Sequence, residues 1–169
     1  TSDLLMARRT SRLPYMDQEV SQEAINDLEE IASAYEHRFF SYAEEDIVKW
    51  TLRMNVDSII DNLQIEDERK EIERWYRHGQ TPRHGDGLWP TPMNQPAWEF
   101  RLGFAVPWVF TLPGIRWWAR RRYLKTQAGT RQIGLLCGPF ERWGELVCAG
   151  ELLMKFWLSM AKHDIYMHP

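Results

Sequence analysis

Along much of this chain an apolar residue recurs every three to four positions, which is the spacing of an α-helix. The pattern predicts a helix that begins after Ser21, one over about 44–63 and one over 67–77. The strongest pattern covers 141–163, and we expect its broad apolar stripe to form core. This stripe comprises Trp143, Leu146, Val147, Gly150, Leu153, Met154, Trp157, Leu158 and Ala161.

The same spacing assigns inward faces to the first two of these helices. After Ser21, whose hydroxyl is suited to cap a helix, the inward residues are Ala24, Ile25, Leu28, Ile31, Ala32 and Tyr35. In the second helix we expect Val48, Leu52, Ile59 and Leu63 to face inward. A further short helix is predicted over residues 2–7.

Three other segments interrupt the helical pattern. Residues 131–137, "RQIGLLC", read as a buried strand. Residues 79–98 are rich in proline and glycine and predict a long loop. Residues 102–115 are apolar but too few to span a bilayer, and their two prolines oppose a regular helix.

Composition narrows the class of protein. A length of 169 residues suits one domain, and 44% hydrophobic content argues against disorder. The net charge of −3 gives no general attraction to nucleic acid, and we expect no nucleic-acid partner. The charge is uneven, with 17 acids against 5 bases over 17–73, and 2 acids against 10 bases over 74–131. These blocks indicate solvated faces, a basic surface for an anionic ligand, or pairing between the two regions.

The two cysteines, Cys137 and Cys148, lie in apolar surroundings and suggest neither a disulfide framework nor a zinc site. We therefore expect a reducing, cytoplasmic compartment. The chain begins at Thr1 and stops directly after the last predicted helix, so we expect a fragment of a longer protein, incomplete at both ends.

Few catalytic or metal motifs are present. The sequence contains no P-loop, dinucleotide-binding fingerprint, HExxH or GxSxG motif. His78, His84 and Asp86 share a loop, but their spacing matches no metal site, and we expect no metal. The segment "ARRTSRLPY", residues 7–15, concentrates three arginines and two hydroxyls. It suits a solvated patch, a nucleic-acid arm or a phosphate cradle, since arginine binds phosphate in a bidentate manner.

Both ends of the chain resemble the FMN-dependent nitroreductase family, and "EIERWYRHG", residues 71–79, with the following "DGL", residues 86–88, resembles its duplicated nitroreductase-like subgroup. The opening, "LLMARRTSRLPYMDQEVSQEAINDLEEIA", matches the family's order of helix, arginine-hydroxyl cluster, short turn and amphipathic helix. The end, "QIGLLC" followed by "ERWGELVCAGELLMKFWLSMAKHDIYMHP", matches its strand, long helix and following turn. The segment "MNQPAW", residues 93–98, shares letters with a family loop in altered spacing.

The resemblance implies a single nitroreductase-like domain over residues 1–169, of the α+β class, rich in helix and with a small sheet. It also implies a homodimer that binds FMN between its subunits and passes hydride from NAD(P)H to nitro compounds, quinones or similar small electron acceptors. The implied cofactor-binding residues are Arg8, Arg9, Thr10 and Arg12 for the phosphate, ribityl chain and ring edge, Asn94, and Met167, His168 and Pro169 near the ring. The catalytic residue stays unassigned.

Two alternatives to this function stay open. One is a protein of the same fold that binds or stores flavin without turnover. The other is a peripheral membrane protein, since "FAVPWVFTLPGIRWWARRRYLK", residues 104–125, joins an apolar stretch to tryptophans and a polybasic run. We favour a lid or a dimer arm that covers the flavin, because the prolines of this segment preclude a continuous amphipathic helix. In a lid, Arg116 and Arg120–Arg122 would attract the phosphates of NAD(P)H.

Overall fold

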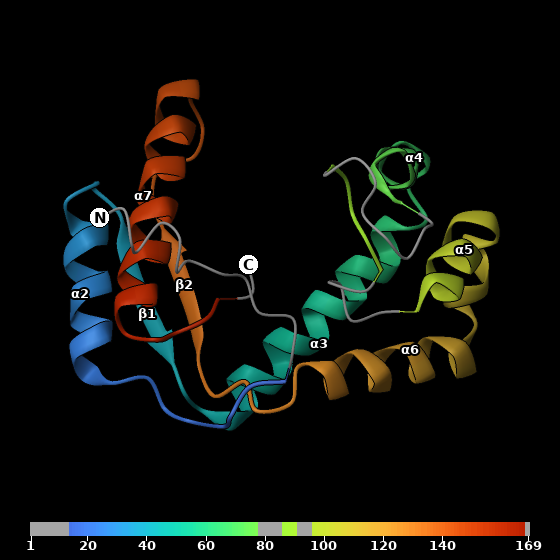
Figure 1. The fold of residues 1–169 in the computed structure, drawn as a ribbon, viewed down its shortest axis with the longest axis horizontal. Coiled ribbons are helices and arrows are strands. Elements are labelled where there is room, and N and C mark those ends of the chain that lie inside the picture. Colours follow the sequence, from blue (N-terminus) through green and yellow to red (C-terminus); the bar gives the residue numbers. More distant parts are fainter. Residues whose placement is uncertain (1–13, 78–85, 91–95, 168–169) are drawn as a thin grey trace. The chain divides into compact units, whose positions relative to one another are not determined.

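The computed structural model describes residues 14–77, 86–90 and 96–167. Within this part of the chain, six α-helices and one short 3₁₀-helix accompany a two-stranded antiparallel sheet (Figure 1). The expected helix-rich α+β class is confirmed at this level. The described residues form two compact units, which we treat separately. Of the described residues, unit 1 contains 16–48 and 129–167, and unit 2 contains 14–15, 49–77, 86–90 and 96–128.

Unit 1 is built from two helices and the sheet. Its elements are α2 (Gln22–Ser33), β1 (Arg38–Tyr42), β2 (Ile133–Cys137) and α7 (Trp143–Lys162). Strand β1 pairs with β2, with Phe40 opposite Leu135. The core joins Leu28 and Ala32 of α2 to Leu152 and Phe156 of α7. As predicted, Ser21 caps α2, its hydroxyl accepting a hydrogen bond from the Ala24 amide at 3.3 Å.

The connection from β2 to α7 requires a glycine. His37 is buried before β1, with its Nδ1 atom 2.6 Å from the Tyr35 carbonyl oxygen. A Cβ atom on Gly138 would lie 2.1 Å from the His37 ring. Only the absence of a side chain at position 138 lets the chain pass this ring on its way to α7.

Two predictions about unit 1 are wrong about which side chains are buried, although strand β2 and helix α7 both form. Strand β2 is not buried, since Leu135 is 47% exposed. The predicted core stripe of α7 is largely exposed as well, with Trp143 at 85% and Val147 at 61%. Helix α7 has apolar residues around most of its circumference, and unit 1 covers only the face that carries Leu152 and Phe156.

Unit 2 is mainly helical. Its elements are α3 (Glu45–Asn62), which begins in the last residues of unit 1, α4 (Glu66–Trp75), α5 (Ala97–Ala105), η1 (Pro107–Thr111) and α6 (Pro113–Thr126). Val56 and Ile60 of α3 pack with Phe110 of η1 to form its core. The predicted inward residue Ile59 is 44% exposed instead, because Val56 and Ile60 define the packed face.

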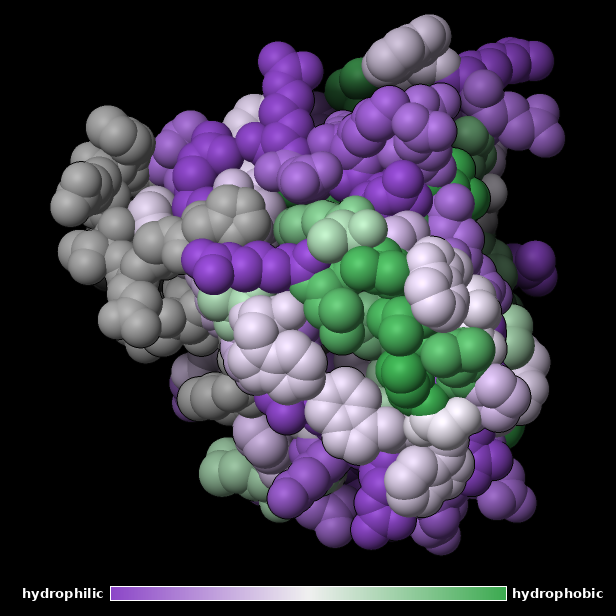
Figure 2. All heavy atoms as spheres, turned by 90° about the vertical axis from the view of Figure 1, so that its right-hand side faces the viewer, coloured by the Kyte–Doolittle hydropathy of each residue, from purple (hydrophilic) through white to green (hydrophobic). Residues whose placement is uncertain are grey.

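Prolines divide residues 97–126 into three helical pieces rather than abolishing helix. Pro107 and Pro113 each occupy a first-turn position, where the missing backbone N–H costs no hydrogen bond. Helix α5 begins at Ala97, so the predicted loop over 79–98 ends earlier than expected. Figure 2 shows hydrophobic side chains gathered in the middle of the face that carries α5 and η1, with hydrophilic side chains above and below.

Candidate functional site

Most of the predicted flavin-binding residues lie outside the described part of the chain. These are Arg8, Arg9, Thr10, Arg12, Asn94, His168 and Pro169. Met167 is described, and its side chain is half-buried in unit 1. The structure therefore describes the segment that leads into the C-terminal part of the predicted site.

The turn between α7 and Met167 is held by specific hydrogen bonds. The Ile165 amide donates to the Met160 carbonyl oxygen at 2.8 Å, and Asp164 adopts a left-handed conformation with φ of 55°. This is the Schellman arrangement, which reverses the chain at the end of a helix. The turn therefore gives the backbone a defined direction on its way to Met167.

Asp27 of α2 secures the same turn from the side. Its carboxylate lies 2.8 Å from His163 Nε2 and 3.0 Å from Lys162 Nζ. Hydrogen bonds from His163 and then Lys162 hold the pKa of Asp27 below its usual range. The start of the predicted ring-binding segment is thereby attached to α2, the helix that follows the arginine-rich N-terminal segment in the sequence.

A hollow of about 560 Å³ lies in unit 1. Its lining residues are Gln22, Ile25, Glu29, Ser41, Ala43, Glu44 and Gln132. The Gln132 amide is already bonded, accepting from the Val20 amide and donating to Ser41 Oγ. Two of the lining residues are acids and none of those described is a cation, so the hollow does not fit a phosphate group.

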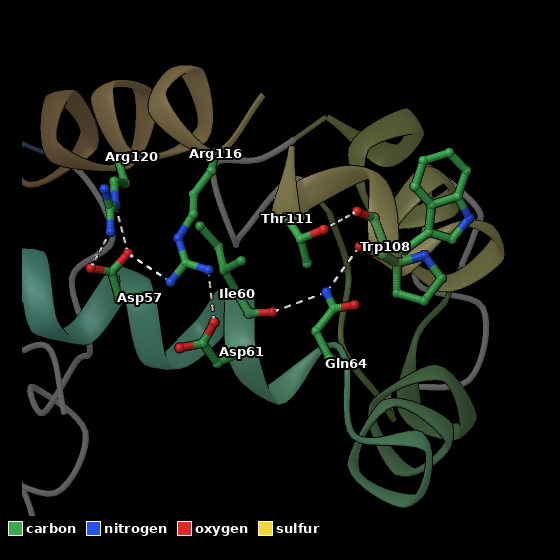
Figure 3. A network of polar contacts seen from close by, with 9 residues as sticks. Asp57, Ile60, Asp61, Gln64, Trp108, Thr111, Arg116 and Arg120 are labelled. Carbon is green, nitrogen blue, oxygen red and sulfur yellow. Dashed lines mark hydrogen bonds and ion pairs between the residues drawn. The ribbon is translucent and has the colours of Figure 1, made fainter. Parts of the chain in front are cut away.

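In unit 2, the acidic and basic blocks of the sequence meet in one ion-pair network (Figure 3). Arg120 of α6 binds Asp57 of α3 in a bidentate manner, with Nε–Oδ1 and Nη2–Oδ2 distances of 2.6 and 2.7 Å. Arg116 bridges two carboxylates, lying 3.3 Å from Asp57 Oδ1 and 2.9 Å from Asp61 Oδ1. Of the three possibilities that the charge blocks left open, pairing between the two regions is realised here.

This network shifts the titration of its members. The hydrogen bond from Arg120 is the main cause that lowers the pKa of Asp57. The hydrogen bond to Asp61 is the main cause that raises the pKa of Arg116. Both shifts favour the charged forms, so the network holds α6 on α3 by charge-assisted hydrogen bonds.

A neutral side chain extends the contact to the end of α3 (Figure 3). Gln64 Nε2 donates to the Ile60 carbonyl oxygen at 3.3 Å and to the Pro107 carbonyl oxygen at 2.9 Å. Thr111 Oγ1 donates to the Trp108 carbonyl oxygen at 2.7 Å and closes η1. The side of η1 and α6 that faces α3 is therefore fixed by polar contacts as well as by the core.

The network alters the interpretation of the polybasic run. Arg116 and Arg120 are engaged with α3, and Arg122 forms a 2.8 Å ion pair with Glu99. Burial is the main cause that raises the pKa of Glu99. Arg121 instead lies over the Trp117 ring, 5.5 Å from its centroid, with no carboxylate partner among the described residues. Of the four arginines expected to attract NAD(P)H, only Arg121 keeps its charge uncompensated in this way.

The remaining candidate chemistry in the described residues is sparse. Asp86 forms an ion pair with Arg77 at 2.9 Å, and His78 and His84 lie outside the described part. No group of three or more His, Cys, Asp or Glu side chains in that part could hold a metal ion. None of the helices described combines the length and the apolar character needed to cross a membrane. Comparison of the chain with protein-family models, curated proteins and solved structures finds no match.

Proposed function

We propose that this protein is an FMN-dependent oxidoreductase of the nitroreductase type. It would take hydride from NAD(P)H and reduce nitro compounds, quinones or similar small acceptors. The sequence resemblance at both ends of the chain underlies the proposal. The structural observation that carries it is the anchored turn after α7, because this turn leads directly into the segment expected to approach the flavin ring.

In this proposal, two segments of the chain bind different parts of FMN. Bound FMN would supply the hydride-accepting chemistry. Its phosphate is assigned to Arg8, Arg9 and Arg12, since the acidic hollow of unit 1 does not suit an anion. Met167 and the residues after it are assigned to the ring, and the contact of Asp27 with Lys162 and His163 keeps their approach in place.

We also propose that two copies of the chain associate through α7. Exposed apolar residues lie at two places along this helix: Trp143, Leu146 and Val147 near its start, and Leu153 and Met154 further along. A Cβ atom on Gly144 or Gly150 would meet no neighbouring atom within 4 Å, so a second helix has room to approach there. A long apolar face of this kind is typical of a self-association surface.

Arginine substitutions test the cofactor assignment. We expect Arg8→Ala and Arg12→Ala each to weaken FMN binding roughly ten- to a hundred-fold, because a hydrogen bond between charged groups contributes about 1.5–3 kcal/mol. Arg142→Ala is the matched control, since this side chain is 86% exposed at the start of α7. Fluorescence titration with FMN measures the affinities. Unchanged affinity in both N-terminal variants would contradict the assignment.

A further inference from the structure

Unit 2 exposes a cluster of large apolar side chains on α5, η1 and α6. We call it the aromatic surface, and its members are Trp98, Trp108, Leu112, Trp117 and Trp118, which are 54, 59, 43, 60 and 37% exposed. Figure 2 shows a patch of hydrophobic side chains on this side of the molecule, with side chains of intermediate hydropathy beside it. Several large apolar side chains exposed on neighbouring elements are typical of a surface that binds another molecule.

The packing of α6 explains why the tryptophans remain exposed. Arg116 and Arg120 lie one helical turn apart and attach one side of α6 to the carboxylates of α3. Trp117 follows Arg116 by one residue, which rotates it about 100° away from this contact. The polar network therefore fixes α6 with its tryptophans turned to solvent, rather than allowing them to enter the core.

Ring contacts organise the aromatic surface. The Trp98 and Trp118 rings lie 6.0 Å apart, which joins α5 to α6. The Arg122 guanidinium lies over the Trp118 ring at 5.8 Å, as Arg121 does over Trp117. Such pairs keep the indole rings at defined positions while their polar N–H groups remain able to reach water or headgroups.

Apart from Glu99, which pairs with Arg122, the charged side chains of α5, η1 and α6 are all cationic. Residues 102–115 contain no charged side chain. Arg121 and Lys125 are exposed on α6 with no carboxylate partner among the described residues, whereas Glu99 is compensated by Arg122. The surface therefore combines tryptophans, aliphatic groups and uncompensated cations, the combination that suits the interface of an anionic bilayer.

We propose that the aromatic surface binds peripherally to anionic lipid bilayers. The tryptophans enter the headgroup region, and Arg121 and Lys125 interact with negatively charged headgroups. The three short helical pieces lie on the membrane, and none of them spans it. This binding does not depend on FMN and brings the protein to a lipid surface whatever its reaction.

Vesicle binding by the full chain tests this proposal. We expect the protein to co-float with vesicles that contain phosphatidylserine in phosphatidylcholine, and to bind vesicles of phosphatidylcholine alone at least tenfold more weakly. The double variant Trp108→Ala/Trp117→Ala should lose binding by at least tenfold. Trp50→Ala is its control, because Trp50 on α3 is 62% exposed and lies outside the aromatic surface.

A charge reversal separates headgroup attraction from apolar adhesion. Arg121→Glu should weaken binding to the anionic vesicles at least fivefold, since one cation near such a surface contributes about this factor. Arg142→Glu makes the same change in net charge at an exposed position of unit 1, outside the aromatic surface, and should leave binding unchanged. Circular dichroism verifies that each variant is folded.

The proposal is overturned by any of three results. These are absence of binding to anionic vesicles, equal binding to neutral vesicles, or equal losses in the aromatic-surface variants and their controls. Since FMN affinity is measured separately, failure here leaves the proposed oxidoreductase function untouched.

Discussion

Asp57 is the residue on which the contact between α6 and α3 depends most. It accepts hydrogen bonds from both Arg116 and Arg120, and its side chain is only 27% exposed. Pairing between the acidic and the basic block was one of the three alternatives that the sequence left open. Its partners could not be named from the sequence, because they lie about sixty positions apart and meet only when two helices pack.

Removing the charge of Asp57 should destabilise unit 2. We expect Asp57→Asn to lower the free energy of unfolding by about 1–3 kcal/mol, because Arg116 and Arg120 lose a partly buried carboxylate partner. Asp61→Asn is the graded control and should cost less, since Asp61 is 62% exposed and its carboxylate pairs, among the described residues, with Arg116 alone. Urea unfolding measures both. Equal effects would contradict the central place given to Asp57.

The same carboxylate predicts an acid dependence. The folded pKa of Asp57 is lowered, so its contribution to stability is complete above the unfolded value of about 3.9 and is lost as the pH falls through the folded pKa. Asp27 acts in the same direction in unit 1. Unfolding of the unmodified protein and of Asp57→Asn should therefore differ most at neutral pH and converge in strong acid. A constant difference at all pH values would refute this linkage.

Among the elements, α7 shows most clearly what a helical pattern can and cannot predict. Its range agrees with the sequence prediction to within two residues at its start and one at its end. Its packed face was predicted wrongly, because apolar residues occupy most of its circumference and periodicity alone cannot select between two apolar faces. Leu152 is fully buried while its neighbour Leu153 is 37% exposed, so adjacent residues mark the two faces.

This difference between neighbours provides a test of the dimer. We expect the unmodified protein to be a dimer in light scattering, and Leu153→Arg to be a monomer or an aggregate, because an arginine would place a charge in the apolar contact. Leu152→Arg should unfold unit 1 instead, since that side chain lies in its core. A monomeric unmodified protein would exclude association through α7.

The segment from α5 to α6 confirms the prediction that its prolines interrupt the helix. Its prolines do prevent one continuous helix, but each of them begins a new helical piece. The three pieces together present an apolar face that no single amphipathic helix would show. The prolines of this segment therefore do not exclude a membrane-facing role, because an apolar face does not require one continuous helix.

On the scale of the whole molecule, local features were predictable and distant pairing was not. The ranges of α2, α3 and α4 follow from periodicity, and that of α2 also from its Ser21 cap. Strand β1 was not predicted, because its five residues carry no clear alternation and acquire their structure by pairing with β2 about ninety residues later. The amino-acid composition also does not reveal the boundary between the two units that lies within α3.

The candidate site follows the same division. The arginine-rich cluster and the C-terminal segment were identified from sequence, since both are local motifs. The contacts that hold the approach to Met167 were not, because Asp27 meets Lys162 and His163 only through the packing of α2 on α7. The ion pairs of Arg116 and Arg120 with α3 could likewise not be predicted from local sequence patterns, because they form only when α6 packs on α3.

The most direct test of the central claim is the visible absorption spectrum of the protein, loaded with FMN and mixed with NAD(P)H without oxygen. The proposed function predicts that the protein retains FMN, that NAD(P)H bleaches the flavin band, and that a quinone restores it. A protein that retains FMN but is not reduced would be a flavin-binding or storage protein instead. A protein that takes up no FMN would contradict the proposed function altogether.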